Sequence, residues 1–153
     1  MKSILFICTG NTCRSPMAEG LLKAALPKNL KIHVSSAGVA AMPGQPASRE
    51  PAVILKKKQA SLKSFKSRQL DTAMLKKVDL VIAMSASHAD LLKRILPEFD
   101  SNVNLLTDFI DSEEGLGGTD VPDPYGLNRD AYEEVAEVIE RSIPGILTAV
   151  KKL

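Results

Sequence analysis

The chain has 153 residues, of which 44% are hydrophobic and 25% charged, and its formal net charge is +2. This length fits a single domain, which we assign to residues 1–153 and expect to bury a continuous core. No apolar run approaches the roughly 20 residues needed to cross a bilayer, so a membrane is not an expected partner. Aromatic residues are few (4%) and show no base-stacking pattern, which argues against nucleic-acid binding. Two cysteines and the lack of a cleavage-site pattern near the first residue predict a protein of the reducing cytoplasm.

The chain opens with the pattern of a strand, a tight loop and a helix. Residues 3–7 are continuously apolar and partly β-branched, which predicts a buried parallel strand. Pro16 suits the first turn of a helix that runs to about Leu26 and stops at Pro27. Between the two lies the loop Cys8-Thr-Gly-Asn-Thr-Cys-Arg14, which aims backbone N–H groups and the positive end of the helix dipole at one point.

This loop combines a nucleophile with an anion cradle. Positive potential around Cys8 favours its thiolate form. Arg14 closes the loop with a planar set of donors that suits tetrahedral oxyanions such as phosphate. The pattern indicates transfer of a phosphoryl group to sulfur and then to water. The alternative for Cys8 is a small buried residue at a strand end.

The rest of the chain continues the alternation of strands and helices. We expect a strand at 30–34, a helix from Ser48, a short helix near 72–77, a strand at 80–84, a helix at 88–96 and a short strand at 103–106. A long loop at 107–124 precedes a closing helix at 128–151, which Pro144 must kink or split. The pattern predicts an α/β fold, a three-layer sandwich in which a small parallel sheet is flanked by helices. The loop after the first strand then lies at the carboxyl edge of the sheet, where ligands bind.

Several motifs together resemble the low-molecular-weight protein tyrosine phosphatase family. The Cys-x5-Arg loop near the start of the chain continues as Ser15-Pro-Met-Ala-Glu19, and the likeness extends over nearly the whole chain. The further matching segments are Ser36-Ala-Gly38, Arg68-Gln-Leu70, Asp79-Leu-Val-Ile-Ala-Met84 and Asp123-Pro-Tyr125.

The resemblance implies a role for each residue of the loop. Cys8 is the expected nucleophile and forms a cysteinyl phosphate, while Arg14 binds the phosphoryl oxygens and stabilises charge in the transition state. Asp123 is the expected proton donor to the leaving group and later the acceptor of a proton from water. The expected substrate-binding positions are Thr9, Gly10, Asn11, Thr12, Cys13, Ser15 and Tyr125.

Supporting roles follow from the same resemblance. Ser15 donates a hydrogen bond to the Cys8 thiolate or caps the helix. Asn11 holds the strained loop with Ser36 as its partner, although Phe65 stands where the family often has a histidine that supports this asparagine. Cys13 forms a reversible disulfide with Cys8, or is a small buried residue.

Thr12 bears on the choice of substrate. Family members acting on phosphotyrosine usually carry an aliphatic residue here, whereas the loop with threonine resembles the protein-arginine phosphatase branch. A hydroxyl can bond a guanidinium N–H or orient water, and Asp123 can both pair with the guanidinium and protonate the departing nitrogen. Tyr125 is the expected aromatic wall for either substrate. The alternative is that Thr12 is a β-branched filler.

We therefore expect a cysteine-dependent protein phosphatase that acts on phosphoarginine, with phosphotyrosine as the alternative. A non-catalytic phosphoprotein-binding module is a third possibility, but simple binding requires neither Cys8 nor Asp123. An arsenate reductase on the same scaffold would need further cysteines. We expect phosphorylated proteins as partners and a monomeric state.

No cofactor and no metal are expected. His33 and His88 lie far apart without ligand spacing, so both are interpreted as structural residues. A basic stretch runs from Lys56 to Arg68 and an acidic one from Asp108 to Glu140. These are two solvated surfaces, or the basic stretch steers an acidic or phosphorylated partner.

Overall fold

The fold is built on a four-stranded parallel sheet, described here from a computed structural model that covers residues 1–98 and 103–153. The strands are β1 (Lys2–Cys8), β2 (Ile32–Gly38), β3 (Leu80–Ala83) and β4 (Val103–Leu105), in the order β2-β1-β3-β4. In the sheet β1 lies between β2 and β3, with Cys8 paired to Gly38 and Ile7 paired to Ala83. The carboxyl ends of the first three strands therefore meet at one edge.

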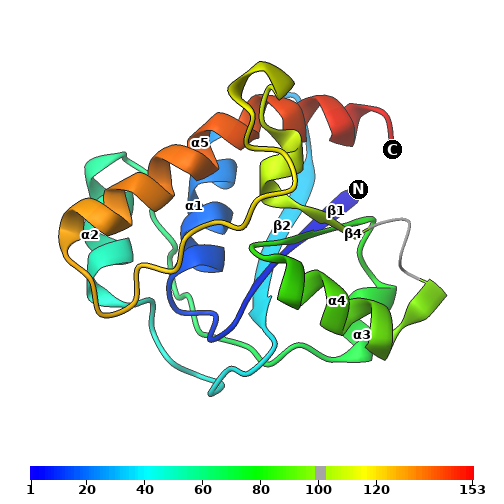
Figure 1. Ribbon diagram of the computed structural model, residues 1–153, viewed down its shortest axis with the longest axis horizontal. Coiled ribbons are helices and arrows are strands. Elements are labelled where there is room, and N and C mark those ends of the chain that lie inside the picture. The colour runs from blue at the N-terminus through cyan, green and yellow to red at the C-terminus, as the bar shows by residue number, and fades with distance from the viewer. Residues whose placement is uncertain (99–102) are drawn as a thin grey trace.

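Helices cover both faces of this sheet, which confirms the predicted three-layer α/β sandwich (Figure 1). One face carries α1 (Arg14–Ala25), α2 (Arg49–Lys57) and the long α5 (Arg129–Lys151). The other face carries the short α3 (Thr72–Lys76) and α4 (Ala86–Ile95). Two 3-10 helices, Leu106–Phe109 and Ser112–Glu114, follow β4.

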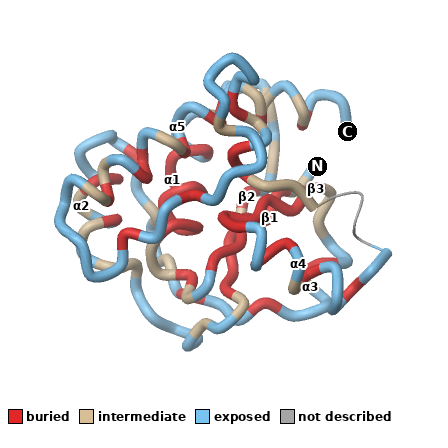
Figure 2. Tube along the Cα trace, viewed as in Figure 1, coloured by how far each residue is buried: buried red, intermediate tan, exposed pale blue. Residues whose placement is uncertain are grey.

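The alternation of side chains along β1 explains the two cores. Ile4 and Phe6 pack with α1, α2 and α5, whereas Leu5 and Ile7 pack with α3 and α4. All four are fully buried, which explains why this stretch is apolar without interruption. Figure 2 shows the buried residues concentrated along β1 and on the inward faces of the helices.

Most predicted elements are present, with shifts at their ends. β2 begins at Ile32 rather than near residue 30, and α4 begins at Ala86 because the Ser85 side chain caps it by accepting from the His88 N–H. The predicted loop at 107–124 is not irregular throughout, since it holds both 3-10 helices. Leu106 belongs to the first of them and not to a strand.

Of the two alternatives predicted for Pro144 in the closing helix, a kink or a split, the split is wrong. α5 is one helix from Arg129 to Lys151 with Pro144 inside it. The missing N–H of proline removes a single helical hydrogen bond. Buried Ile139, Ile143 and Ile146 lie on both sides of the proline in the same core, so packing holds the helix together.

The basic and acidic stretches of the sequence partly pair with each other. Lys57, which ends α2, and Lys58, which follows it, form salt bridges to Glu133 and Glu140 of α5, at 3.5 and 2.6 Å. Among the described residues, no helix combines the length and apolarity needed to cross a membrane.

Candidate active site

The predicted phosphate loop lies where β1 passes into α1, at the carboxyl edge of the sheet. It forms a pocket of about 290 Å³ together with two residues of the loop before α5. The structure thus brings most of the predicted site residues to one place; those lining the pocket are Cys8, Thr9, Gly10, Thr12, Cys13, Arg14, Asp123 and Tyr125. The remaining three, Asn11, Ser15 and Ser36, are buried and do not line the pocket.

The sulfur of Cys8 lies within reach of two donors. The backbone N–H of Asn11 points at it over 3.3 Å, and the Ser15 hydroxyl oxygen lies 2.9 Å away. The Asn11 amide nitrogen donates to the Ser15 oxygen, also over 2.9 Å. Because Ser15 accepts that bond, its own hydroxyl proton is free to turn toward Cys8. Two donors at one sulfur stabilise a thiolate.

Asn11 fixes the shape of the loop. Its φ is +56°, in the left-handed region that side chains other than glycine rarely adopt. Its side-chain nitrogen donates to both Ser15 and Ser36, and its side-chain oxygen accepts the backbone N–H of Arg68 at 2.8 Å. The predicted Asn11–Ser36 contact is therefore present, and the amide is fully bonded without a histidine at residue 65.

This bonding continues to a residue to which the sequence interpretation gave no role. The Ser36 hydroxyl donates to the buried carboxylate of Glu19 over 2.7 Å, and Glu19 also pairs with Lys23 four residues later on α1. A glutamate inside an otherwise apolar helix face was the sequence signal for a buried polar contact. That signal could not identify the partner of Glu19, because Ser36 lies 17 residues further along the chain.

Arg14 joins the phosphate loop to the loop that carries Asp123. Its guanidinium is buried and donates through Nη1 to the Val121 carbonyl over 3.0 Å. Its Nη2 lies 3.8 Å from one carboxylate oxygen of Asp123, while the other oxygen accepts the backbone N–H of Tyr125. The Asp123 side chain remains 58% exposed, which leaves it open to a substrate above the loop.

His88, predicted to be a structural residue, contacts the phosphate loop. It lies in the first turn of α4, and its Nε2 lies 2.9 Å from the hydroxyl of Thr9 in the phosphate loop. Its Nδ1 lies 2.9 Å from the hydroxyl of Ser85. Burial, followed by the positive charge of Arg14, lowers the pKa of His88 and keeps the ring neutral. Its position just after β3, at the same sheet edge as Cys8, was the signal that could have revealed this contact.

Cys13 differs from Cys8 although both are free and both belong to the loop. Burial, the neighbouring Cys8 and then Asp123, against the opposing effect of Arg14, raise the pKa of the Cys13 thiol to about 12. Cys13 is therefore a protonated thiol at neutral pH. Over residues 1–98 and 103–153, no group of three or more metal-ligating side chains gathers at this or any other place.

Comparisons with known proteins agree with this geometry. The model of the family described as low molecular weight phosphotyrosine protein phosphatase matches residues 3–153. The chain is 35% identical over 152 residues to a probable low molecular weight protein-tyrosine-phosphatase, AmsI, of Erwinia amylovora, covering 99% of both chains. It is 33% identical over 150 residues to the protein-arginine-phosphatase of Bacillus subtilis, covering 97% of both.

A solved structure gives the same result for the fold. The YwlE arginine phosphatase from Geobacillus stearothermophilus superposes with a TM-score of 0.87 at 32% identity, covering 99% of this chain and 94% of that one. The family model, the two relatives and the solved structure all match the region that carries the loop from Cys8 to Arg14. The chain therefore belongs to the low molecular weight phosphotyrosine protein phosphatase family and is a cysteine-based protein phosphatase.

Proposed function

We propose that the protein removes phosphoryl groups from arginine side chains of proteins through a cysteinyl-phosphate intermediate. The observation that carries this proposal is Thr12, a hydroxyl residue lining the pocket beside Cys8 and Asp123. Membership of a family of enzymes argues against the non-catalytic binding module.

In the first step, the Cys8 sulfur attacks phosphorus in line with the leaving group. The S–P bond forms, the P–N bond of phosphoarginine breaks, and the Asp123 carboxylic acid gives its proton to the departing guanidine nitrogen. Arg14 and the backbone N–H groups of the loop bind the three other phosphoryl oxygens, whose charge grows in the transition state. The buried Arg14 side chain is already ordered by its bond to Val121, so little ordering is needed during the reaction.

In the second step, water replaces sulfur on phosphorus. The Asp123 carboxylate accepts a proton from the attacking water, the S–P bond breaks, and inorganic phosphate and the Cys8 thiolate are formed. The two donors at the sulfur, the Asn11 N–H and the Ser15 hydroxyl, favour thiolate departure.

Several features support phosphoarginine as the substrate. A guanidinium has polar N–H groups along its whole edge, and the hydroxyl of Thr12 and the carbonyl oxygen of the Asp123 carboxyl group are acceptors for them. A site built to bond these groups rejects a ligand that leaves them unpaired. The similarity to a named protein-arginine-phosphatase is consistent with this choice.

Phosphotyrosine is the second candidate, and Tyr125 is the observation that favours it. Its side chain lines the pocket and is 85% exposed, so it offers a free face on which an aromatic ring can stack. The similarity to tyrosine phosphatases at 35% identity is equally consistent with this substrate.

The test compares hydrolysis of two peptides of one sequence, carrying phosphoarginine or phosphotyrosine. The wild type is measured beside Thr12→Ser, which keeps the hydroxyl, and Thr12→Val, which keeps the shape without it. We expect the wild type and Thr12→Ser to prefer phosphoarginine, and Thr12→Val to lose that preference. If phosphotyrosine is preferred by all three, the protein is a tyrosine phosphatase and Thr12 is a packing residue. Activity remaining in Cys8→Ser would overturn the mechanism as well.

A further inference from the structure

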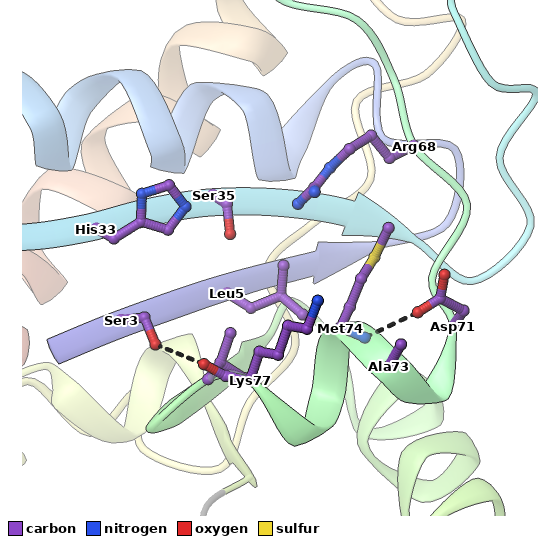
Figure 3. Close-up of a pocket in the computed structure, with 10 residues that line it drawn as sticks. Ser3, Leu5, His33, Ser35, Arg68, Asp71, Ala73, Met74 and Lys77 are labelled. Atoms are coloured by element: carbon purple, nitrogen blue, oxygen red, sulfur yellow. Dashed lines mark hydrogen bonds between the residues drawn. The ribbon is translucent and has the colours of Figure 1, made fainter. Parts of the chain in front are cut away.

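A second pocket lies on the other face of the sheet from α1 and α5. It has a volume of about 350 Å³, within the usual range for small-molecule sites, and is at least as large as the pocket at Cys8. Figure 3 shows its walls: His33 and Ser35 from β2, Ser3 and Leu5 from β1, and Met74 and Lys77 from α3 and its end. No part of the phosphate loop lines it.

The fold explains why this face is left open. β2 is an edge strand, and Ser3 and Leu5 of β1 pair with His33 and Ser35 of β2. α3 packs on this side of the sheet but has only five residues. The pocket is the space between this short helix and the edge strand.

The rim of the pocket is positively charged. The side chains of Arg68 and Lys77 extend toward the pocket from opposite sides (Figure 3). Neither forms a salt bridge with any residue in the described part of the chain. The carboxylate on the rim, Asp71, is turned to the start of α3, where one oxygen accepts the Met74 N–H over 2.8 Å. The pocket therefore favours an anion.

The floor of the pocket is apolar. Leu5 is fully buried beneath it, and the half-buried side chains of Met74 and Val78 form one wall. A thioether packs well against the edge of an aromatic ring, and cations above a ring face add a further attraction. A small aromatic carboxylate therefore fits this pocket, with its ring on the apolar floor and its carboxylate at the positively charged rim.

Arg68 connects this pocket to the phosphate loop. Its Nε and Nη2 donate to the Ser36 carbonyl at 3.2 and 3.1 Å, and its backbone N–H donates to the side-chain oxygen of Asn11. A guanidinium has five N–H donors, so the remaining ones are available to a ligand without loss of these bonds. The same residue thus lines the second pocket and holds the asparagine whose N–H points at Cys8.

We propose that this pocket is a second binding site, for a small aromatic carboxylate held by Arg68 and Lys77, and that its occupancy is sensed at Asn11. The ring lies over Leu5 and Met74, and the carboxylate bonds the two cations. This inference concerns the opposite face of the sheet and does not depend on which phosphorylated residue Cys8 acts on.

The test is a titration of the ¹⁵N-labelled full chain with isophthalate, followed by amide NMR in saturating inorganic phosphate, which occupies the Cys8 loop. We expect saturable shifts at Leu5, Ser35 and Met74, with a smaller shift at Asn11. The neutral analogue 1,3-benzenedimethanol, of the same shape, serves as the ligand control and should give no saturable shift. Phosphatase activity and melting temperature establish that each variant is folded.

The two matched variants change neighbouring lysines at the carboxyl end of α3. Lys77→Gln removes a rim cation and should weaken isophthalate binding about fivefold, as for loss of one exposed ion pair. Lys76→Gln removes the same charge one residue earlier, outside the pocket lining, and should leave binding within about twofold. Equal weakening by both variants, an absence of saturable shifts, or shifts that appear only without phosphate would overturn the proposed site. Saturable binding with Asn11 unmoved would overturn the connection through Arg68.

Discussion

The Ser15 hydroxyl oxygen lies 2.9 Å from the sulfur of Cys8, and it already accepts a hydrogen bond from Asn11. This order of donors leaves the Ser15 proton for the sulfur. We therefore expect the serine to assist the step in which sulfur departs from phosphorus, when a full negative charge forms on the sulfur.

Ser15→Ala should lower kcat by about 10- to 100-fold, because a hydrogen bond to a charged group is lost. Decay of the cysteinyl phosphate should slow more than its formation, so a burst of the first product should appear in rapid-mixing experiments. Ser142→Ala is the matched control, since Ser142 is also fully buried and its hydroxyl donates to the Ile139 carbonyl within α5. A similar fall in kcat for both variants would mean that Ser15 acts through stability alone.

Asp123→Asn should remove the proton donor and lower kcat on phosphoarginine peptide by about 10²- to 10⁴-fold. An aryl phosphate with a strongly acidic phenol needs no proton on departure, so cleavage of its ester bond should be much less affected. Asp120→Asn, three residues earlier, is the control because its side-chain oxygen accepts the Ala86 N–H and an asparagine keeps that bond. If release of the first product, measured in a single turnover, slows equally for both substrates in Asp123→Asn, the carboxyl group does not protonate the leaving group.

His88 should make stability depend on pH. Burial, and after it the charge of Arg14, lowers the pKa of His88 in the folded protein, so the unfolded chain binds the extra proton more readily. Neutral His88 therefore makes its full contribution to the free energy of unfolding above the ordinary histidine pKa of about 6.5. This contribution is lost as the pH falls from there through the lowered pKa of the folded protein. Urea unfolding between pH 5 and 8 should show a smaller decline in His88→Asn than in the wild type. His33→Asn, at an exposed position, should behave as the wild type does, and an unchanged decline in His88→Asn would contradict the assignment.

Cys13 should resist alkylation at neutral pH. A thiol with a pKa of about 12 holds almost no thiolate at pH 7.5, and burial remains the main cause when Cys8 is replaced. Iodoacetamide followed by mass spectrometry should therefore label Cys8 in the wild type and label no cysteine in folded Cys8→Ser. The same variant unfolded in urea should be labelled at Cys13, and fast labelling of the folded variant would show that Cys13 is a reactive thiol.

Local sequence chemistry could place Cys8 and Arg14, whereas the distant Asp123 and Ser36 came only from the family resemblance. Cys8 and Arg14 lie on one loop between an apolar strand and a helix, so topology alone brings them to the sheet edge. The contacts that sequence could not place join distant segments: His88 with Thr9, Arg68 with Asn11, and Glu19 with Ser36. Each is an ordinary polar residue in its own segment, and its partner depends on strand order.

Pro144 shows the same limit in the fold. Local sterics correctly identify a lost hydrogen bond, but the helix continues because distant core residues hold both halves. The adjacent Gly145 shows how close that packing is, since a Cβ there would clash with the Phe109 carbonyl oxygen. Tertiary burial outweighs the local preference at this point.

Gly38 should be the glycine on which the phosphate loop depends. It ends β2 beside Cys8, and a Cβ added to it would lie 2.5 Å from the Thr9 carbonyl oxygen and 2.9 Å from the Asn11 nitrogen. These are backbone atoms, so Gly38→Ala forces the loop itself to move. We expect about 1–3 kcal/mol of lost stability from overpacking. We also expect kcat to fall by about 10- to 100-fold because the Cys8 sulfur and the loop N–H groups lose their alignment.

Gly117→Ala is the matched control, since a Cβ there meets nothing within 4 Å, and it should change neither the stability nor kcat. Urea unfolding and kcat measured on all three proteins decide the matter: wild-type kcat in Gly38→Ala would mean that the chemistry tolerates movement of the loop.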